Sequence, residues 1–256
     1  MARKPRDAVF TTALWDGNTK IAHFDHHMKR LRNHADRLRI NLPENSEQLI
    51  AESILDNMEK FSEKKLINIT FDYISGEFQT KSRELPKLRN CNIDAMTIPM
   101  KKWLGQVTGT KHGDWQFYID AKDVAEQNGV DIALLIDEYC IIDSDRAAIV
   151  VIDEDGVAYI SDSKQTVEGV TLEILTGGFT EMGIPLNKAK LNERLVARCT
   201  EIIALGTGIG CCRIVTIDGE DIGNKNSAIS IKFQAYLAQH YSNTCLLYTS
   251  PSPRDS

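Results

Sequence analysis

The chain has 256 residues, of which 42% are hydrophobic and 26% charged, and its formal net charge is −6. This composition is typical of globular proteins and excludes a wholly disordered chain, a collagen or a coiled coil. A mildly acidic chain is a poor nucleic-acid binder, because phosphate contacts need a clustered basic surface. No apolar run approaches the roughly 20 residues of a membrane-spanning helix, and residues 1–7 precede no apolar segment of a secretory signal.

The six cysteines contain no C-x-x-C pair, and their spacing indicates neither a zinc site nor a disulfide framework. Reduced thiols in a cytoplasmic protein without a metal are the simpler interpretation. The length fits two modest domains or one large α/β unit.

The first part of the chain alternates strand and helix patterns. Predicted elements are a strand at 9–15, a helix at 26–38, a second helix around 49–58, a strand at 66–74 and a charged loop at 79–90. Residues 93–112 have no clear period and include Pro99 and several glycines, so we place the domain boundary there.

The second part predicts the remaining elements. They are helices at 114–128, 169–178, 191–202 and 230–241, strands at 132–136, 148–152 and 157–160, two strands around 206–210, and a turn at 217–219. The pattern predicts an α/β (α+β) fold in two parts, with boundaries at 1–98, 99–112 and 113–244.

The last residues, 245–256, have no periodicity and break the preceding pattern. Their sequence resembles a sequencing adapter translated in frame, as occurs in assembled metagenome DNA, although an ordinary Ser/Pro tail is the alternative. We expect this tail to be non-native and give it no functional role.

Two glycine-containing segments are candidate anion sites. Gly169-Val170-Thr171 opens a helix, where backbone N–H groups and the helix dipole favour negative charge. The loop 206–210, Gly-Thr-Gly-Ile-Gly, follows an apolar strand and can direct N–H groups at a phosphate, although a plain turn is the alternative. It is no dinucleotide fingerprint, because Cys211 stands where the third glycine is needed.

Lys111 lies between irregular chain and a predicted helix. A lysine at a domain boundary can be desolvated, which lowers its pKa and frees its amine for Schiff-base chemistry. The alternative is an ordinary surface lysine.

A set of motifs follows one another along nearly the whole chain before the tail. They are a strand ending in D-G at 16–17, H-x-x-R-L at 27–31, a lysine before a helix, D-x-A-L-L-x-D at 131–137, G-V-T at 169–171, G-T-G-x-G at 206–210 and I-D-G at 217–219. The ordered set resembles the class IV aminotransferases, pyridoxal-phosphate enzymes of fold type IV. These include branched-chain and D-amino-acid aminotransferases, (R)-selective amine transaminases and aminodeoxychorismate lyases.

The resemblance implies a two-lobed fold, with a small N-terminal α/β lobe, a larger β-rich lobe and the cofactor between them. It implies that Lys111 forms the Schiff base with pyridoxal phosphate and that Arg30 binds the cofactor phosphate, a role suited to a planar fork of donors.

The resemblance also assigns both glycine-containing segments to that phosphate. Val170 and Thr171 match the helix N-terminus that receives it, and Thr207 with Gly208 match the loop on its other side.

Relatives have a glutamate that pairs with the pyridine nitrogen and keeps it protonated, so that the ring acts as an electron sink. No glutamate stands at the matching position here. Asp143 is the candidate if the hairpin is one residue shorter than in relatives, and Asp145 is the second choice. The alternative for both is a solvated carboxylate in a turn.

The implied activity is transfer of an amino group between an amino acid or amine and a 2-oxo acid, by a cytoplasmic homodimer. Two alternatives stay open: aminodeoxychorismate lyase, which eliminates pyruvate, and a phosphate-ligand binding protein that has lost catalysis. Residues 10–13, Phe-Thr-Thr-Ala, resemble the lyases, whereas residues 14–17, Leu-Trp-Asp-Gly, resemble the amine transaminases. Relatives also carry a longer segment before this strand, which indicates a short subfamily or a missing gene start.

Overall fold

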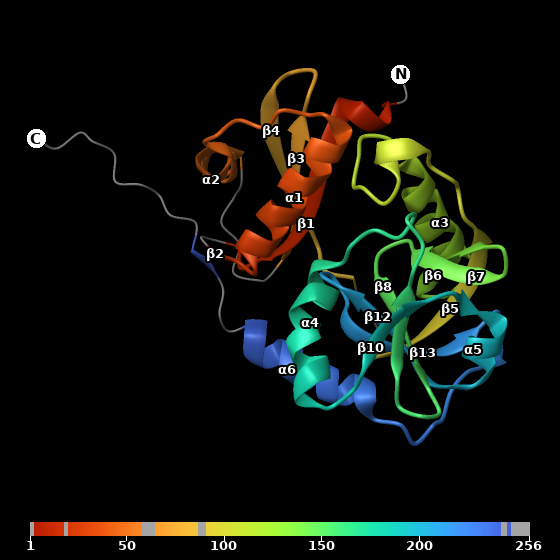
Figure 1. Cartoon of the computed structure of the whole chain (residues 1–256). Helices are drawn as coiled ribbons and strands as arrows, with labels where there is room; N and C mark the ends of the chain where they lie inside the picture. The colour runs from red at the N-terminus through yellow and green to blue at the C-terminus, as the bar shows by residue number, and fades with distance from the viewer. Residues whose placement is uncertain (1–2, 18–19, 58–64, 87–90, 242–244, 247–256) are drawn as a thin grey trace, which may run out of the picture. The chain divides into compact units, whose positions relative to one another are not determined.

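A computed structural model describes residues 3–17, 20–57, 65–86, 91–241 and 245–246. The chain divides into two compact units (Figure 1). Unit 1 contains Met1–Leu85, Lys111–Gly113 and Asn243–Ser256, and unit 2 contains Pro86–Thr110 and Asp114–Ser242. Both units combine helices with a sheet, which confirms the mixed α/β fold class. Among the described residues, no helix is long and apolar enough to cross a membrane.

Unit 1 is built on a five-stranded sheet in the order β15-β2-β1-β3-β4. Its elements are η1 (Pro5–Asp7), β1 (Ala8–Trp15), β2 (Lys20–Ile21), α1 (Phe24–Leu38), α2 (Ser46–Asn57), β3 (Lys65–Asp72), β4 (Glu77–Arg83) and β15 (Cys245–Leu246). Helix α1 packs against β1 and α2 against β4. Since α1 covers β1, this strand is buried along most of its length.

In unit 1, strands occur in two segments for which the sequence predicts no regular structure. The charged loop expected at 79–90 is wrong for its first part, because β4 pairs with β3 in register. Its residues alternate between exposed and covered, and Phe78 packs on Phe71 with ring centroids 5.0 Å apart. At the other edge, Cys245–Leu246 pair with Lys20–Ile21. The rest of the tail, 247–256, lies outside the described residues.

Unit 2 contains a ten-stranded sheet in the order β10-β9-β8-β12-β13-β5-β6-β7-β11, with β14 paired to β13. The strands are β5 (Asn92–Pro99), β6 (Ile132–Asp137), β7 (Cys140–Ser144), β8 (Ala148–Asp153), β9 (Ala158–Ser161), β10 (Leu186–Ala189), β11 (Leu191–Asn192), β12 (Cys199–Gly206), β13 (Gly210–Ile217) and β14 (Glu220–Asp221). The helices are η2 (Gly105–Val107), α3 (Gln116–Gln127), α4 (Val170–Glu181), α5 (Glu193–Ala197) and α6 (Ile229–Tyr241).

The central strands of unit 2 are covered on both faces. All six residues of β8 are buried. Val150 and Ile152 pack with α4 and α6, and Ile149 and Val151 pack in a second apolar cluster with β5, β6 and β13. Burial on both faces explains why these strands read as continuous apolar runs rather than alternating patterns.

Three predictions in unit 2 are corrected. The helix expected at 191–202 is wrong, because α5 covers only Glu193–Ala197 and Cys199 begins β12, which pairs with β8. The segment 93–112 is not irregular throughout, since Asn92–Pro99 pairs in parallel with β6 and β13. Helix α4 does not end at Gly177-Gly178 but continues to Glu181.

These two glycines have a packing role. A Cβ at Gly177 would lie 2.5 Å from the hydroxyl of Tyr236, and one at Gly178 would lie 3.1 Å from its ring. The side chain of Tyr236 on α6 therefore occupies the space that a side chain at Gly177 or Gly178 of α4 would need. Close packing between α4 and α6 thus explains two glycines that the sequence analysis interpreted as the end of the helix.

The hairpin between β6 and β7 is short. Asp137 pairs with Cys140, so only Glu138 and Tyr139 form the turn, with φ of 47° and 60°. These are the left-handed values of a type I′ turn, which glycine and asparagine adopt more easily. The register shifts between Leu135 and Ile136, which is a β-bulge before Asp143.

Candidate functional site

Arg30 lies on the buried face of α1 and is 8% exposed. Its Nη2 donates to Oγ1 of Thr11 on β1, at 2.7 Å, and this oxygen lies 2.9 Å from Nδ1 of His27. Burial, and then the charge of Arg30, hold the pKa of His27 well below its usual value. Because the Thr11 oxygen accepts from Arg30, its own proton can go to Nδ1 of a neutral His27. The guanidinium is thus held in place by neutral groups.

Lys111 belongs to the segment that returns to unit 1. Its carbonyl accepts the N–H of Phe10 at 3.3 Å, and its own N–H donates to Nδ1 of His34 at 3.1 Å. The next residue, His112, forms a β-bridge with Val9. The Nζ atom lies 5.1 Å from the ring centroid of Phe10, within the range of a cation–π contact. Lys111 is therefore half-buried and anchored by its backbone on both sides.

His34 is a functional candidate that the sequence reasoning missed. It is fully buried one helical turn after Arg30. Burial, then the charges of Arg30 and Lys111, lower its pKa to about 2. The available signal was its i+4 spacing from Arg30 on the apolar face of the predicted helix.

Asp143 lies on β7 and Asp145 directly follows this strand; both are buried, at 4% and 7% exposure, so neither is a solvated turn carboxylate. One oxygen of Asp143 accepts the N–H of Ser144, and the other accepts the N–H of Val167, both at 2.9 Å. Both bonds come from backbone N–H groups, so the backbone orients the Asp143 carboxylate.

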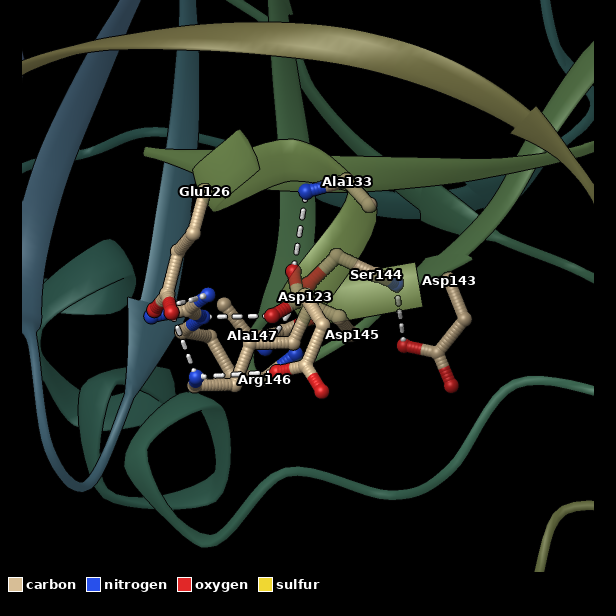
Figure 2. A network of polar contacts seen from close by, with 9 residues as sticks. Asp123, Glu126, Ala133, Asp143, Ser144, Asp145, Arg146 and Ala147 are labelled. Atoms are coloured by element: carbon tan, nitrogen blue, oxygen red, sulfur yellow. Dashed lines mark hydrogen bonds and ion pairs between the residues drawn. The ribbon is translucent and has the colours of Figure 1, made fainter. Parts of the chain in front are cut away.

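Asp145 is committed to the protein itself. Oδ1 accepts the N–H of Ala133 at 2.9 Å, and Oδ2 pairs with Nε of Arg146. Figure 2 shows this carboxylate between the two groups, with Glu126 on the other side of Arg146. Burial raises the pKa of Asp145, and Arg146 with the Ala133 N–H opposes the rise. Oδ1 thus ties the residue after β7 to β6, and Oδ2 is already paired with the cation of Arg146, which favours Asp143 over Asp145 as a ligand.

The N-terminus of α4 and the 206–210 loop adopt the expected forms. Helix α4 begins at Val170, and its N-cap is Gly169, which has no side chain to accept the first N–H groups. Val170 and Thr171 are buried. Thr207 and Gly208 are half-buried in the tight turn between β12 and β13, where Gly206 pairs with Gly210. Backbone N–H groups in such positions suit an anion.

Contacts within unit 2 bring these segments together. Asp143 bonds to Val167, three residues before α4. A Cβ on Gly206 would lie 2.7 Å from the carbonyl oxygen of Arg146, so the 206–210 loop lies close to the connection between β7 and β8. A Cβ on Gly169 would lie 3.1 Å from Cβ of Ala148 at the start of β8. Asp143, Thr171 and Thr207 therefore lie on neighbouring segments.

Each unit offers groups that fit one part of pyridoxal phosphate. Unit 1 holds the buried guanidinium of Arg30 and the amine of Lys111, and its His34 has a buried Nε2 with no hydrogen-bond partner among the described residues. Unit 2 holds backbone donors for a phosphate and a carboxylate for a ring nitrogen. Donors for an anion, an amine for a carbonyl carbon and a carboxylate for a pyridinium match this cofactor. Among the described residues, no group of three or more His, Cys, Asp or Glu could hold a metal.

Comparison with known proteins gives one family and one fold. The family model of amino-transferase class IV matches residues 8–217. No curated protein sequence matches the chain.

Solved structures resemble the chain at low identity. A hypothetical aminotransferase from Mycobacterium tuberculosis in its apo form aligns with a TM-score of 0.79 at 13% identity, over 93% of this chain and 90% of that one. A branched-chain aminotransferase from Thermoproteus uzoniensis with norvaline gives 0.78 at 17%, over 95% and 91%. The Mycobacterium protein in a form bound to PLP gives 0.77 at 13%, over 92% and 89%.

Proposed function

Because the chain belongs to the class IV aminotransferases, we propose that it is a pyridoxal-phosphate enzyme that transfers an amino group between an amino acid, or amine, and a 2-oxo acid. The observation that carries this proposal is the environment of Lys111. This lysine is anchored beside β1 in the same unit as the buried Arg30, so an amine and an anion-binding guanidinium share one fixed framework.

The residues divide the work of holding the cofactor. Lys111 carries it covalently, and Arg30 binds its phosphate through a fork of charged donors. Val170, Thr171, Thr207 and Gly208 receive the same phosphate through backbone N–H groups and hydroxyls. Asp143 pairs with the pyridine nitrogen, and the bonds that it accepts from the N–H groups of Ser144 and Val167 orient the carboxylate for this pairing.

Bound pyridoxal phosphate supplies an electron sink for the negative charge that develops at the substrate Cα. Lys111 supplies the proton transfers. Once the substrate amine has replaced its own, the free Nζ of Lys111 would take the proton from the substrate Cα and later give it back. Asp143 holds the proton of the ring nitrogen in place throughout. Water would then release the 2-oxo acid while the amino group stays behind, and a second 2-oxo acid would take up this amino group with loss of water.

Substitution of Lys111 tests the proposal. The purified protein, incubated with pyridoxal phosphate, should gain a visible absorption band that borohydride converts to a stable modification of Lys111. Lys111→Ala should lose the band, the modification and turnover, whereas the control Lys225→Ala, at an 83% exposed side chain, should retain all three. A wild-type protein that ignores the cofactor would contradict the proposal.

Product analysis separates the alternatives. Transfer requires an amino acceptor, so release of pyruvate without an acceptor would indicate a lyase instead. Cofactor binding without either reaction would indicate a binding protein. The resemblance further implies a homodimer in the cytoplasm, and light scattering of the purified protein tests the dimer.

A further inference from the structure

The contact between His34 and Lys111 joins two segments that are 77 residues apart in sequence. The N–H of Lys111 donates to Nδ1 of His34 at 3.1 Å, and its carbonyl accepts from Phe10 on β1. The peptide on both sides of the lysine Cα is therefore held, by α1 through one side chain and by β1 through the backbone.

This contact fixes the protonation of the imidazole. Nδ1 accepts a hydrogen bond, so it carries no proton, and a neutral ring must carry its proton on Nε2. The groups that act on the ring from α1 are Arg30 and Arg37, and those from the returning segment are Lys111 and His112. All four disfavour a second proton, as does complete burial, so the acceptor persists across the physiological pH range.

We propose that His34 is a positioning residue for the cofactor-binding lysine: as a neutral imidazole protonated on Nε2, it accepts the N–H of Lys111 and sets the point from which the amine of that residue extends. This inference rests on the proposed function, because the position of Lys111 matters only if its amine reacts.

The spacing along α1 gives the contact a wider consequence. His34 follows Arg30 by four residues, so both lie on one face of the helix, one turn apart. One rigid element therefore carries the guanidinium proposed for the phosphate and the acceptor that holds the lysine backbone. The distance between the phosphate site and the amine is then set by a helical turn rather than by a loop.

A matched pair of substitutions isolates the acceptor. In His34→Asn the amide oxygen stands at the place of Nδ1, whereas His34→Leu has nearly the same shape and no acceptor. His34→Gln is a second variant without an acceptor at that place, since its amide lies at the distance of Nε2, and it keeps polarity if the leucine variant does not fold.

Two measurements do not depend on turnover. In the cofactor-free protein, the amide of Lys111 should exchange with solvent much faster in His34→Leu or His34→Gln than in wild type, and His34→Asn should restore its protection. In the loaded protein, the pH titration of the lysine–cofactor absorption band should shift in the same two variants and stay at the wild-type midpoint in His34→Asn. Turnover should fall about 10- to 100-fold without the acceptor, the loss expected from a misplaced reacting group.

The outcomes separate this inference from the proposed function. If wild type forms the lysine–cofactor band and all variants titrate alike, His34 has no positioning role and the inference is overturned. If wild type forms no band, the proposed function fails, and the positioning role fails with it even where the amide exchange confirms the contact.

Discussion

The candidate groups in the two units are held by different means. In unit 1 the groups are side chains in a buried network, where Thr11, His27 and His34 fix Arg30 and Lys111. In unit 2 the donors are mostly backbone N–H groups at a helix start and a tight turn, and the carboxylate of Asp143 is itself oriented by backbone N–H groups. Unit 1 should therefore respond to side-chain substitution and protonation, and unit 2 to changes that alter its backbone or remove its carboxylate.

The largest expected effect is an acid sensitivity confined to unit 1. The folded-state pKa values of His27 and His34 lie below the unfolded value of about 6.5, so the unfolded chain binds more protons below that pH. The stabilising contribution of the two histidines is fully present above pH 6.5 and is lost as the pH falls, by about 1.4 kcal/mol per pH unit for His34. By pH 5 His34 should cost about 2 kcal/mol of the free energy of unfolding, and the lowered pKa of His27 adds to this loss.

Tryptophan fluorescence can assign this loss to one unit. Trp15 is buried in unit 1, and a variant with Trp103→Phe and Trp115→Phe would report on it alone. In urea titrations at pH 7, 6 and 5, the unfolding midpoint reported by Trp15 should fall with pH. In His34→Asn this midpoint should depend less steeply on pH. Equal pH dependence in both units would contradict the comparison.

The next largest effects are expected from substitutions of Asp143 and Asp145, of which the first should affect turnover and the second stability. Asp143→Asn should lower turnover on the order of a hundredfold, because an amide does not hold the ring nitrogen protonated, while the Lys111 modification still forms. Asp145→Asn should instead lower stability by about 1–3 kcal/mol, because Arg146 loses its buried partner and keeps only Glu126. Activity assays and urea titrations of both variants check this, and a reversed pattern would make Asp145 the ligand.

A smaller effect is expected when the charge of Arg30 is kept. Arg30→Lys retains a cation but loses the fork and the bond to Thr11, so cofactor affinity should fall about tenfold, equivalent to about 1.4 kcal/mol. Arg32→Lys is the matched control, since Arg32 lies on the same helix, is 49% exposed on its side chain and pairs with Glu47. Fluorescence titration with pyridoxal phosphate measures both. Unchanged affinity in Arg30→Lys would assign the phosphate to other groups.

Much of the fold was predictable where local pattern and tertiary packing agree. The strand at 9–15 and the helix at 26–38 carry clear periods and are confirmed. The helix expected at 191–202 failed because Glu201–Ile203 pair with β8, and only this pairing, not the spacing of apolar residues, decides that they are extended. The edge strand β4 was missed because one of its faces is polar and exposed.

The candidate site was predictable as far as its residues form motifs. Arg30 and Lys111 come from such patterns, and their assignment to the cofactor stays a prediction. His34 was missed because its proposed role depends on a contact with residue 111, which no local pattern encodes. The choice between Asp143 and Asp145 depends on hydrogen bonds from Ala133 and Val167, which only the folded sheet brings near.

The smallest effect concerns a backbone feature of unit 2, the turn at Glu138 and Tyr139. Both residues have positive φ, and Tyr139 is 78% exposed, so its side chain contributes little packing to offset the strain. Replacing the pair by Asn-Gly should stabilise unit 2 by about 1 kcal/mol. The turn between β13 and β14 is the matched control, because Asp218 and Gly219 already suit their φ of 50° and 85°. There Gly219→Ala should destabilise by a similar amount, and urea titration followed by the unit 2 tryptophans measures both. If the Asn-Gly variant is no more stable than wild type, the hairpin that presents Asp143 is not strained.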